Sequence, residues 1–307
     1  NTNTTTEVVE GLMVLNKAVG TAAVVNLSVG GNDGTGGAGA DIARLARSNQ
    51  ITGTVSLLAS GLLDFAGFSN TVTGLTLHAG PTFSSRVDLN GGTMTLNGNA
   101  SHSNAEGTQF RTSPAAIIED GTLALGGTNR TFTVNDAGLN IRELQIDALI
   151  TGTAGLTTAG GGLLVLNANN TGLSGTVNIG GVIGTTNTAG NLVVGNSGAF
   201  GTATVNVQLV ASTLFTSSQI NGAAINLVNA ITLNSNLTLR GDRSLTLSGT
   251  ISGQGAANRQ ITASMESGAT VILSGLINLS NDGTARDLVF ANSTLNSPLF
   301  VTGTIAS

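Results

Sequence analysis

The chain has 307 residues, of which 44 are Gly and only 9% are charged, and it contains no Cys, no Trp and no Tyr. Hydrophobic residues make up 40% of the sequence, which excludes a disordered tail, because such tails are poor in apolar residues and rich in charge. The net charge of −5 and the scattered basic residues disfavour nucleic-acid binding, which needs a basic stripe to neutralise phosphates.

Three features bear on where the chain resides. No apolar run approaches the length of a membrane-spanning helix, so we do not expect the chain to span a membrane. The first residue is Asn rather than Met and no signal peptide precedes it, which favours a processed fragment or subunit of a longer repetitive protein. The absence of Cys fits a bacterial surface protein that crosses a membrane unfolded, although it does not by itself name a compartment.

The first element predicted in chain order is a short helix over residues 40–50, which follows the Gly-rich stretch Gly30–Gly39. Ile42, Leu45 and Ala46 lie at helical spacing, and Arg44 and Arg47 lie on the opposite side. We expect this helix to pack against the flank of the fold or to cap one end.

The remaining elements are short strands that end in Asn or Gly. In each one, two apolar residues alternate with a polar residue, which is the period of a strand with one buried face. The clearest examples are Leu75–His78, Met94–Gly98, Leu123–Gly126, Leu237–Gly241, Leu245–Gly249 and Val271–Gly275. Such segments are too short to pair stably alone, so they need stacked neighbours, as in a solenoid.

The spacing between equivalent strands distinguishes among all-β folds. The interval from Leu96 to Leu125 is clearly shorter than the interval from Leu125 to Leu166. A strict short-period β-roll would not tolerate this variation, but a parallel β-helix would, because the loops between its strands vary freely. A sandwich or an antiparallel barrel is the alternative fold, because short strands separated by turn signals also describe those folds. The sequence predicts one elongated β-solenoid over residues 1–307.

The segment Gly160–Val207 is the most informative. It contains a Gly-rich turn, an apolar strand over residues 163–166, the turn Asn170-Thr171, a strand over residues 191–194 and a corner at Ala199-Phe200-Gly201. This order resembles the autotransporter-associated β-strand repeat of bacterial surface proteins. The segment departs from the repeat after Asn170-Thr171, where Gly172-Leu173 replaces an aromatic, and in the longer link 182–189. The resemblance implies an all-β, right-handed parallel β-helix, exported to the cell surface and without catalytic residues.

Candidate catalytic and metal-binding residues are few. The adjacent pairs Glu119-Asp120 and Arg142-Glu143 are as easily turn or solvent-face residues as a glycosidase pair, which must face each other across a cleft. His78 and His102 would stack if the interval between them were close to one solenoid turn, but without further ligands we expect two surface imidazoles rather than a metal site. Gly30–Gly37 faintly matches a calcium-binding nonapeptide, but it occurs in one copy only, which favours a plain turn.

Two short motifs could be recognition signals. Arg240-Gly241-Asp242 spells an integrin-binding tripeptide, but the end of a strand followed by a Gly turn explains it equally well. Asn129-Arg130-Thr131, Asn236-Leu237-Thr238 and Asn292-Ser293-Thr294 match a glycosylation signal. Asn residues whose amides bond from one turn of the solenoid to the next are the better interpretation.

The sequence therefore predicts a secreted structural component of a bacterial cell surface, such as a stalk, a coat or a self-associating fibre subunit. The alternative is an adhesin passenger domain that presents a binding face or loop, with Gly91–Pro114 as the best loop. A polysaccharide-active enzyme is a third interpretation, which the lack of Trp and Tyr platforms disfavours. We expect no enzyme activity, catalytic residue, metal site or cofactor.

The expected partners follow from the two ends of the sequence. Asn1–Thr6 carries no cap pattern, and Leu295–Ile305 is still apolar and strand-like. Bare terminal turns expose unpaired backbone groups, so we expect association with copies of the chain, end to end or by strand addition, or with its own continuation. A host or surface glycan or protein is a further partner.

Overall fold

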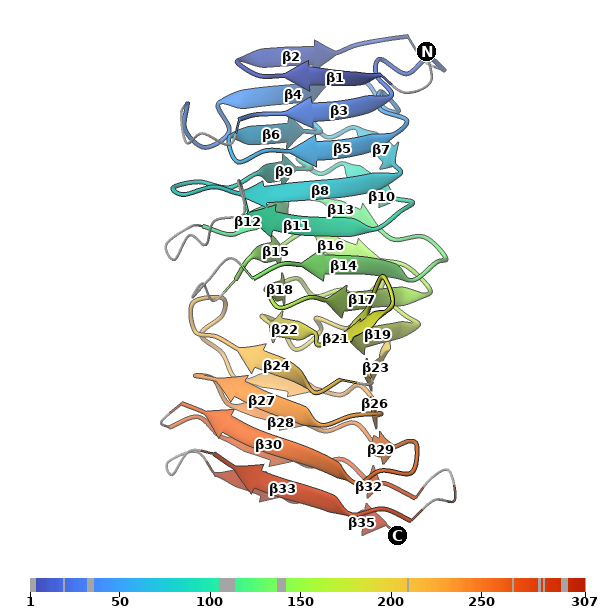
Figure 1. Ribbon diagram of the computed structural model, residues 1–307, viewed down its shortest axis with the longest axis vertical. Helices are drawn as coiled ribbons and strands as arrows, with labels where there is room; N and C mark the ends of the chain where they lie inside the picture. The colour runs from blue at the N-terminus through green and yellow to red at the C-terminus, as the bar shows by residue number, and fades with distance from the viewer. Residues whose placement is uncertain are drawn as a thin grey trace. The chain divides into compact units, whose positions relative to one another are not determined.

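The computed structural model describes residues 4–18, 20–31, 36–104, 114–136, 142–208, 210–266, 268–280, 283, 285–293 and 298–306 (Figure 1). The chain divides into two compact units. Unit 1 comprises residues 1–153 and 162–164, and unit 2 comprises residues 154–161 and 165–307. Strand β18 (Leu163–Leu166) contributes residues to both.

Unit 1 is built from three parallel sheets. The first sheet has the order β1 (Thr5–Val8), β3 (Asn26–Val29), β5 (Thr54–Leu57), β8 (Gly74–Ala79), β11 (Ala100–Asn104) and β14 (Arg130–Val134). The second has β2 (Leu12–Leu15), β4 (Asp41–Leu45), β6 (Gly61–Asp64), β9 (Arg86–Asp88), β12 (Ala116–Glu119) and β15 (Leu144–Ile146). The third has β7 (Ser69–Val72), β10 (Thr93–Leu96), β13 (Thr122–Ala124) and β16 (Leu149–Thr151).

Unit 2 repeats this arrangement. Its first sheet has the order β17 (Gly155–Ala159), β19 (Thr176–Ile179), β23 (Thr204–Val207), β26 (Ile231–Leu233), β29 (Ile251–Gly253), β32 (Ile277–Asn278) and β35 (Ile305–Ala306). The second has β22 (Asn191–Val194), β24 (Ser212–Thr216), β27 (Leu237–Gly241), β30 (Arg259–Met265) and β33 (Leu288–Asn292). The third has β25 (Ile225–Leu227), β28 (Leu245–Leu247), β31 (Val271–Leu273) and β34 (Leu299–Val301). An antiparallel hairpin, β20 (Gly181–Ile183) and β21 (Thr186–Thr188), interrupts the coil.

The parallel β-helix expected from the sequence is confirmed. The chain visits the sheets in turn, so that each strand pairs in parallel with its equivalent one turn, or rung, later. Rung length is not constant, because Val55 pairs with Leu75 across a short rung, whereas Ala100 pairs with Phe132 across a longer one. This variation lies in the loops, as the unequal spacing of the strands predicts.

The helix predicted over residues 40–50 is wrong. Residues 41–45 form strand β4, and the described residues contain no helix. Ala43 and Leu45 face the core and pair with Met13 and Leu15, whereas Arg44 faces outward. The apolar residues of this segment fit the period of a helix and also the alternating period of a strand. Pairing of β4 with β2 on one side and β6 on the other selects the strand.

The core consists of columns of inward residues in strict register. One column in unit 1 is Leu27, Val55, Leu75, Ala100 and Phe132, and one in unit 2 is Val177, Val205, Ile231, Ile251 and Ile277. All of these residues are buried. Each large aliphatic side chain buried in this way contributes roughly 1.5–3 kcal/mol. The short Leu-x-Leu strands of the sequence thus form a continuous core within each unit.

Asn side chains connect successive rungs, as predicted. On the outer face of unit 2, the Asn178 amide donates to Thr157 Oγ1 over 3.0 Å, and the Asn206 amide donates to Asn178 Oδ1 over 3.2 Å. Asn236, from one of the glycosylation-like triplets, accepts from the Gln260 N–H at 2.9 Å. Such amide ladders satisfy polar groups from one rung to the next.

Candidate functional site

The outer face of the second sheet of unit 1 carries a column of charged side chains. Successive strands place Arg44, Asp64, Asp88 and Glu119 in one column, because Arg44 pairs with Asp64, Asp64 with Asp88, and Asp88 with Glu119. Arg86 precedes Asp88 on the same face of β9, and Arg142 lies just before β15. We call these six residues the charged strip. In a chain with 9% charged residues, this concentration is the main departure from a neutral surface.

Asp64 anchors one end of the charged strip. Its carboxylate accepts from Arg44 Nε at 2.6 Å, from the Ala66 N–H at 2.8 Å and from the Asn90 amide at 2.9 Å. Burial opposes ionisation of Asp64, but these donors together hold its pKa below the usual range. Asp64 is therefore a structural anion whose acceptor sites are already occupied.

Glu119 and Arg86 form the centre of the strip. Arg86 Nε donates to the Glu119 carboxylate, and Arg86 Nη2 lies 3.4 Å from Asp88 Oδ2. Burial has the largest effect on the pKa of Glu119 and raises it; Arg86 lowers this pKa and Asp120 and Asp88 raise it, and the net pKa lies above the usual value. Glu119 therefore takes up a proton more easily than an ordinary Glu side chain does.

A shallow pocket of about 340 Å³ opens beside Glu119. It is lined by Arg86, Pro114, Ala115, Ile117, Glu119, Arg142 and Gln145. Arg142 Nη1 donates to Gln145 Oε1 at 3.0 Å, and the Gln145 amide donates to both carboxylate oxygens of Asp147, at 2.9 and 2.8 Å. Gln145 is only 8% exposed although it faces outward. The pocket therefore has a fixed polar wall and an apolar floor at Ile117.

Neither adjacent pair singled out in the sequence forms a pair of carboxylates across a cleft. Glu119 belongs to the strip, whereas Asp120 occupies a turn with φ of 57°. Glu143 is buried and accepts from the Leu163 N–H at 2.5 Å, so it fixes backbone, while its neighbour Arg142 lines the pocket. Within the described ranges, no cluster of three or more potential metal ligands occurs.

The two histidines do not stack, and the expectation of two surface imidazoles is wrong for His102. The rung between β8 and β11 brings His102 opposite Leu77 and Ser103 opposite His78. His78 faces outward, with its Nδ1 3.1 Å from Ser103 Oγ. His102 faces the core, is fully buried, and neither ring nitrogen has a hydrogen-bond partner. The sequence pattern missed this because His102 occupies an apolar position of an otherwise regular strand.

The tripeptide Arg240-Gly241-Asp242 begins within β27 rather than at a loop tip. The Arg240 guanidinium lies 5.4 Å from the centre of the Phe215 ring, and Asp242 accepts from the Ser218 N–H at 2.7 Å. Both side chains therefore have partners within the chain. This arrangement supports the strand-and-turn interpretation of the motif.

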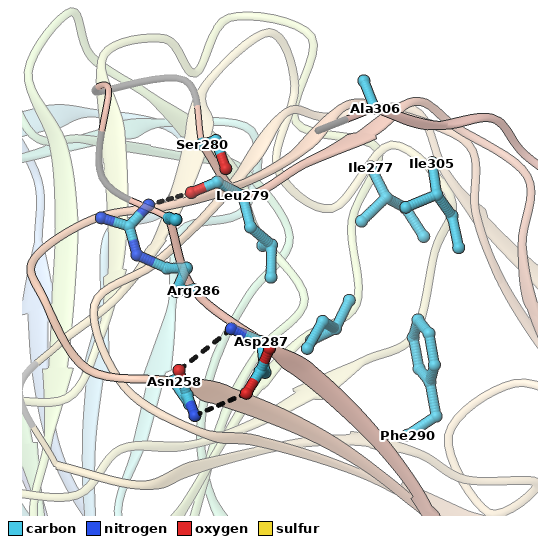
Figure 2. Close-up of a pocket in the computed structure, with 11 residues that line it drawn as sticks. Asn258, Ile277, Leu279, Ser280, Arg286, Asp287, Phe290, Ile305 and Ala306 are labelled. Carbon is cyan, nitrogen blue, oxygen red and sulfur yellow. Dashed lines mark hydrogen bonds between the residues drawn. The ribbon is translucent and has the colours of Figure 1, made fainter.

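A larger pocket, of about 520 Å³, lies at the last described rung of unit 2 (Figure 2). Ile277, Leu279, Phe290 and Ile305 form its apolar part, and Arg286, Asp287 and Asn258 form its polar rim. Asn258 and Asp287 bond to each other twice, at 3.0 and 3.1 Å. Arg286 donates to the carbonyls of Gly253, Gly255 and Leu279. The polar groups of the rim thus bond mainly within the chain.

Other candidates from the sequence fall wholly or partly outside the described residues. These are the turn Gly30–Gly37, of which residues 32–35 are not described, and the loop Gly91–Pro114, of which residues 105–113 are not described. A protruding element that the sequence did not single out as a site is the hairpin β20–β21, on which Val182 and Ile183 are exposed. Its only sequence signal is the longer link at residues 182–189.

No protein family, curated protein or solved structure matches the chain. The resemblance of Gly160–Val207 to the autotransporter-associated repeat therefore stays a prediction. Among the residues whose structure is described, none form a helix of the length and apolarity needed to cross a membrane.

Proposed function

We propose that this chain is a structural component of a bacterial cell surface, a β-helical subunit of a stalk, coat or fibre that associates with copies of itself. The observation that carries the proposal is the way in which successive rungs of unit 2 bury one another. Ile251, Ile277 and Ile305 form one inward column, in which Ile251 and Ile277 are buried and Ile305 is 62% exposed. What buries each inner rung is the next rung, so the surface around Ile305 at the last described rung would accept a further rung, from a copy of the chain or from its continuation.

The described edge strands supply the backbone for such contact. β33, β34 and β35 each pair on one side only, as do β1 and β2 in unit 1. Exposed Leu12 and Val14 lie on β2, and exposed Val289 and Phe300 lie on β33 and β34. Unpaired edge strands bind further strands by backbone hydrogen bonding. A head-to-tail contact between copies would generate a fibre, because it is heterologous and does not close.

The surface location rests on sequence features rather than on the fold. The chain lacks Cys, carries few charges, and contains the segment Gly160–Val207 that resembles a passenger repeat. Because the chain carries few charges, repulsion between like charges would oppose close packing of neighbouring copies only weakly. These features favour an exported, densely packed assembly.

Light scattering after size-exclusion chromatography, together with negative-stain electron microscopy of the 307-residue chain, tests the proposal. We expect concentration-dependent oligomers and filaments. Ile305→Asp should abolish them, because a carboxylate would be buried in the contact. Val228→Asp, at an exposed apolar position away from the last rung, should leave association unchanged. A monodisperse monomer at high concentration without filaments would contradict self-association.

A second candidate function is an adhesin that presents a binding face on the same scaffold. The charged strip is the specific observation that favours it, since the sheet that carries it needs no charges for rung stacking. The second sheet of unit 2, which stacks in the same way, presents Thr213, Thr238 and Thr262 in register instead. Panels of soluble glycans and extracellular proteins, tested against the wild-type chain and against a variant with Arg86, Glu119 and Arg142 replaced by Gln, would decide. Equal binding by both would overturn this candidate.

A further inference from the structure

We infer that the pocket beside Glu119 binds a small hydroxylated ligand that carries a carboxylate, of the chemical class of an acidic sugar residue. The inference rests on the second candidate function, a binding face at the charged strip, and it does not depend on self-association. The pocket volume of about 340 Å³ lies at the small end of ligand sites, which suits one sugar residue.

Arg142 is the group that selects a carboxylate. Its Nη1 is held by Gln145 Oε1 at 3.0 Å, which orients the guanidinium along the pocket wall. Gln145 is itself fixed by two hydrogen bonds to Asp147, so the donor direction is set before any ligand arrives. A guanidinium binds a carboxylate through two parallel N–H donors, which gives geometric as well as electrostatic selectivity.

The charges of the side chains that line the pocket favour an anionic ligand over a cationic one. Arg86 and Arg142 line the pocket with Glu119 as the one carboxylate. Arg86 is engaged by Glu119 and Asp88, whereas Asp147 accepts from the Gln145 amide. The positive charge of Arg142 is therefore the one that faces the pocket without a direct carboxylate contact among the described ion pairs.

The other side of the pocket suits hydroxyl groups. Glu119 accepts hydrogen bonds, and Arg86 beside it donates them, so the pair offers both kinds of partner to a vicinal diol. Ile117, which precedes Glu119 on the same strand β12, supplies an apolar patch for the C–H face of a sugar ring. An uncharged apolar ligand would displace water from these polar groups without offering them hydrogen bonds in its place and is disfavoured.

The test uses ¹⁵N-labelled full-length chain titrated with D-galacturonate and, as a matched neutral probe, D-galactose, followed by NMR. We expect galacturonate to shift the amide signals of Ala115, Ile117 and Gln145, with an affinity roughly tenfold or more above that of galactose. Arg142→Gln should weaken galacturonate binding about tenfold. Arg47→Gln, at an exposed Arg whose Nε donates to Asn16 away from the pocket, is the matched control and should bind like wild type.

Glu119→Gln separates the competing interpretations. If the pocket takes an anion, removal of this carboxylate leaves galacturonate binding unchanged or tighter. Loss of binding in Glu119→Gln together with wild-type binding in Arg142→Gln would mean a cation site and would overturn the inference. Shifts at the same amides with galactose equal to those with galacturonate would overturn the acidic class but keep the binding face. If neither sugar shifts these amides, the inference falls, while the binding face is still tested by the panels of glycans and proteins.

Discussion

His102 lies directly in register with Leu77, on the inward face of consecutive strands of unit 1. The same column continues to Val134 on β14, so an imidazole replaces an aliphatic side chain between two others. Both of its ring nitrogens are buried without a hydrogen-bond partner. A buried polar group in this position costs free energy that an apolar residue of similar size would not.

The first prediction concerns pH. Burial, with a smaller effect of His78 in the same direction and an opposing effect of the Asn135 backbone, lowers the pKa of His102 from its ordinary 6.5 to about 4. The unfolded chain thus takes up the proton first, so the free energy of unfolding should fall as pH drops from 6.5 to about 4, by about 3 kcal/mol. Above pH 6.5 the full stability is present. Urea denaturation from pH 7.5 to 4 would measure this.

Replacement by Leu tests the same residue. His102→Leu should stabilise the chain at pH 5 and should remove most of the decline, because it completes the apolar column. His78→Gln, on the outward face, should retain the larger part of the decline. A His102→Leu variant with an unchanged pH profile would show that other groups govern acid stability.

The second prediction concerns Asp64, which acts in a lower pH window. Its pKa lies below the ordinary 3.8, so its contribution is present above pH 3.8 and is lost as pH falls through the folded-state value. Asp64→Asn should cost about 1 kcal/mol at pH 7, since its partner Arg44 is half exposed. It should also flatten the stability profile below pH 4. Glu10→Gln, at an exposed position, should change neither quantity.

The third prediction concerns Gly241, whose backbone has φ of 128°. A Cβ atom at this position would overlap the carbonyl oxygen of Thr216 on the neighbouring strand. Gly241→Ala should therefore destabilise unit 2 by about 3 kcal/mol, through both the strained φ and the overlap. Gly222→Ala, where a Cβ meets open space, should be nearly neutral by thermal denaturation. Equal effects of the two substitutions would contradict the steric argument.

The fourth prediction concerns Asn70, a buried side chain that replaces a missing backbone partner. Its amide donates to the Ile51 carbonyl at 2.9 Å, and its Oδ1 accepts from the Ile51 N–H at 2.9 Å. Asn70→Ala should cost about 2–4 kcal/mol, because both Ile51 groups lose this partner. Asn187→Ala, on the exposed hairpin, is the control. Amide hydrogen exchange at Ile51 should accelerate only in Asn70→Ala.

The fifth prediction concerns Arg259, a buried guanidinium bonded to backbone carbonyls of the turn before it and of strand β26. It donates to Leu233 at 2.9 Å and to Ala257 at 2.7 Å, with further bonds to Asn258 and Gln254. Arg259→Lys cannot reproduce this planar set of donors and should cost roughly 2 kcal/mol or more in chemical denaturation. Arg240→Lys, over the Phe215 ring, should cost less than about 1 kcal/mol. If Arg259→Lys left the stability unchanged, the turn would not depend on the hydrogen bonds of this guanidinium.

The sequence alone determined the fold class and most of the core. Alternation in segments such as Leu237–Gly241 is a local property, because a period of two fixes which side chains face inward wherever a strand forms. Leu164, Leu166, Val177, Ile179, Leu245 and Leu273 are accordingly buried. Val193 is buried too, but it belongs to the outward column of Phe215 and Arg240. The Asn contacts between rungs were also predictable from composition.

Features that depend on the register between rungs follow from the folded chain and not from local sequence. Asp64, Asp88 and Glu119 stand at unequal intervals along the chain, and no local pattern shows that each of these intervals equals one rung. The same holds for His102, which is inward because the loop before it brings it into register with Leu77. Residues 41–45 carry both helical and strand spacing, and pairing with β2 and β6 selects the strand. Loop length sets register, and register sets which side chains meet.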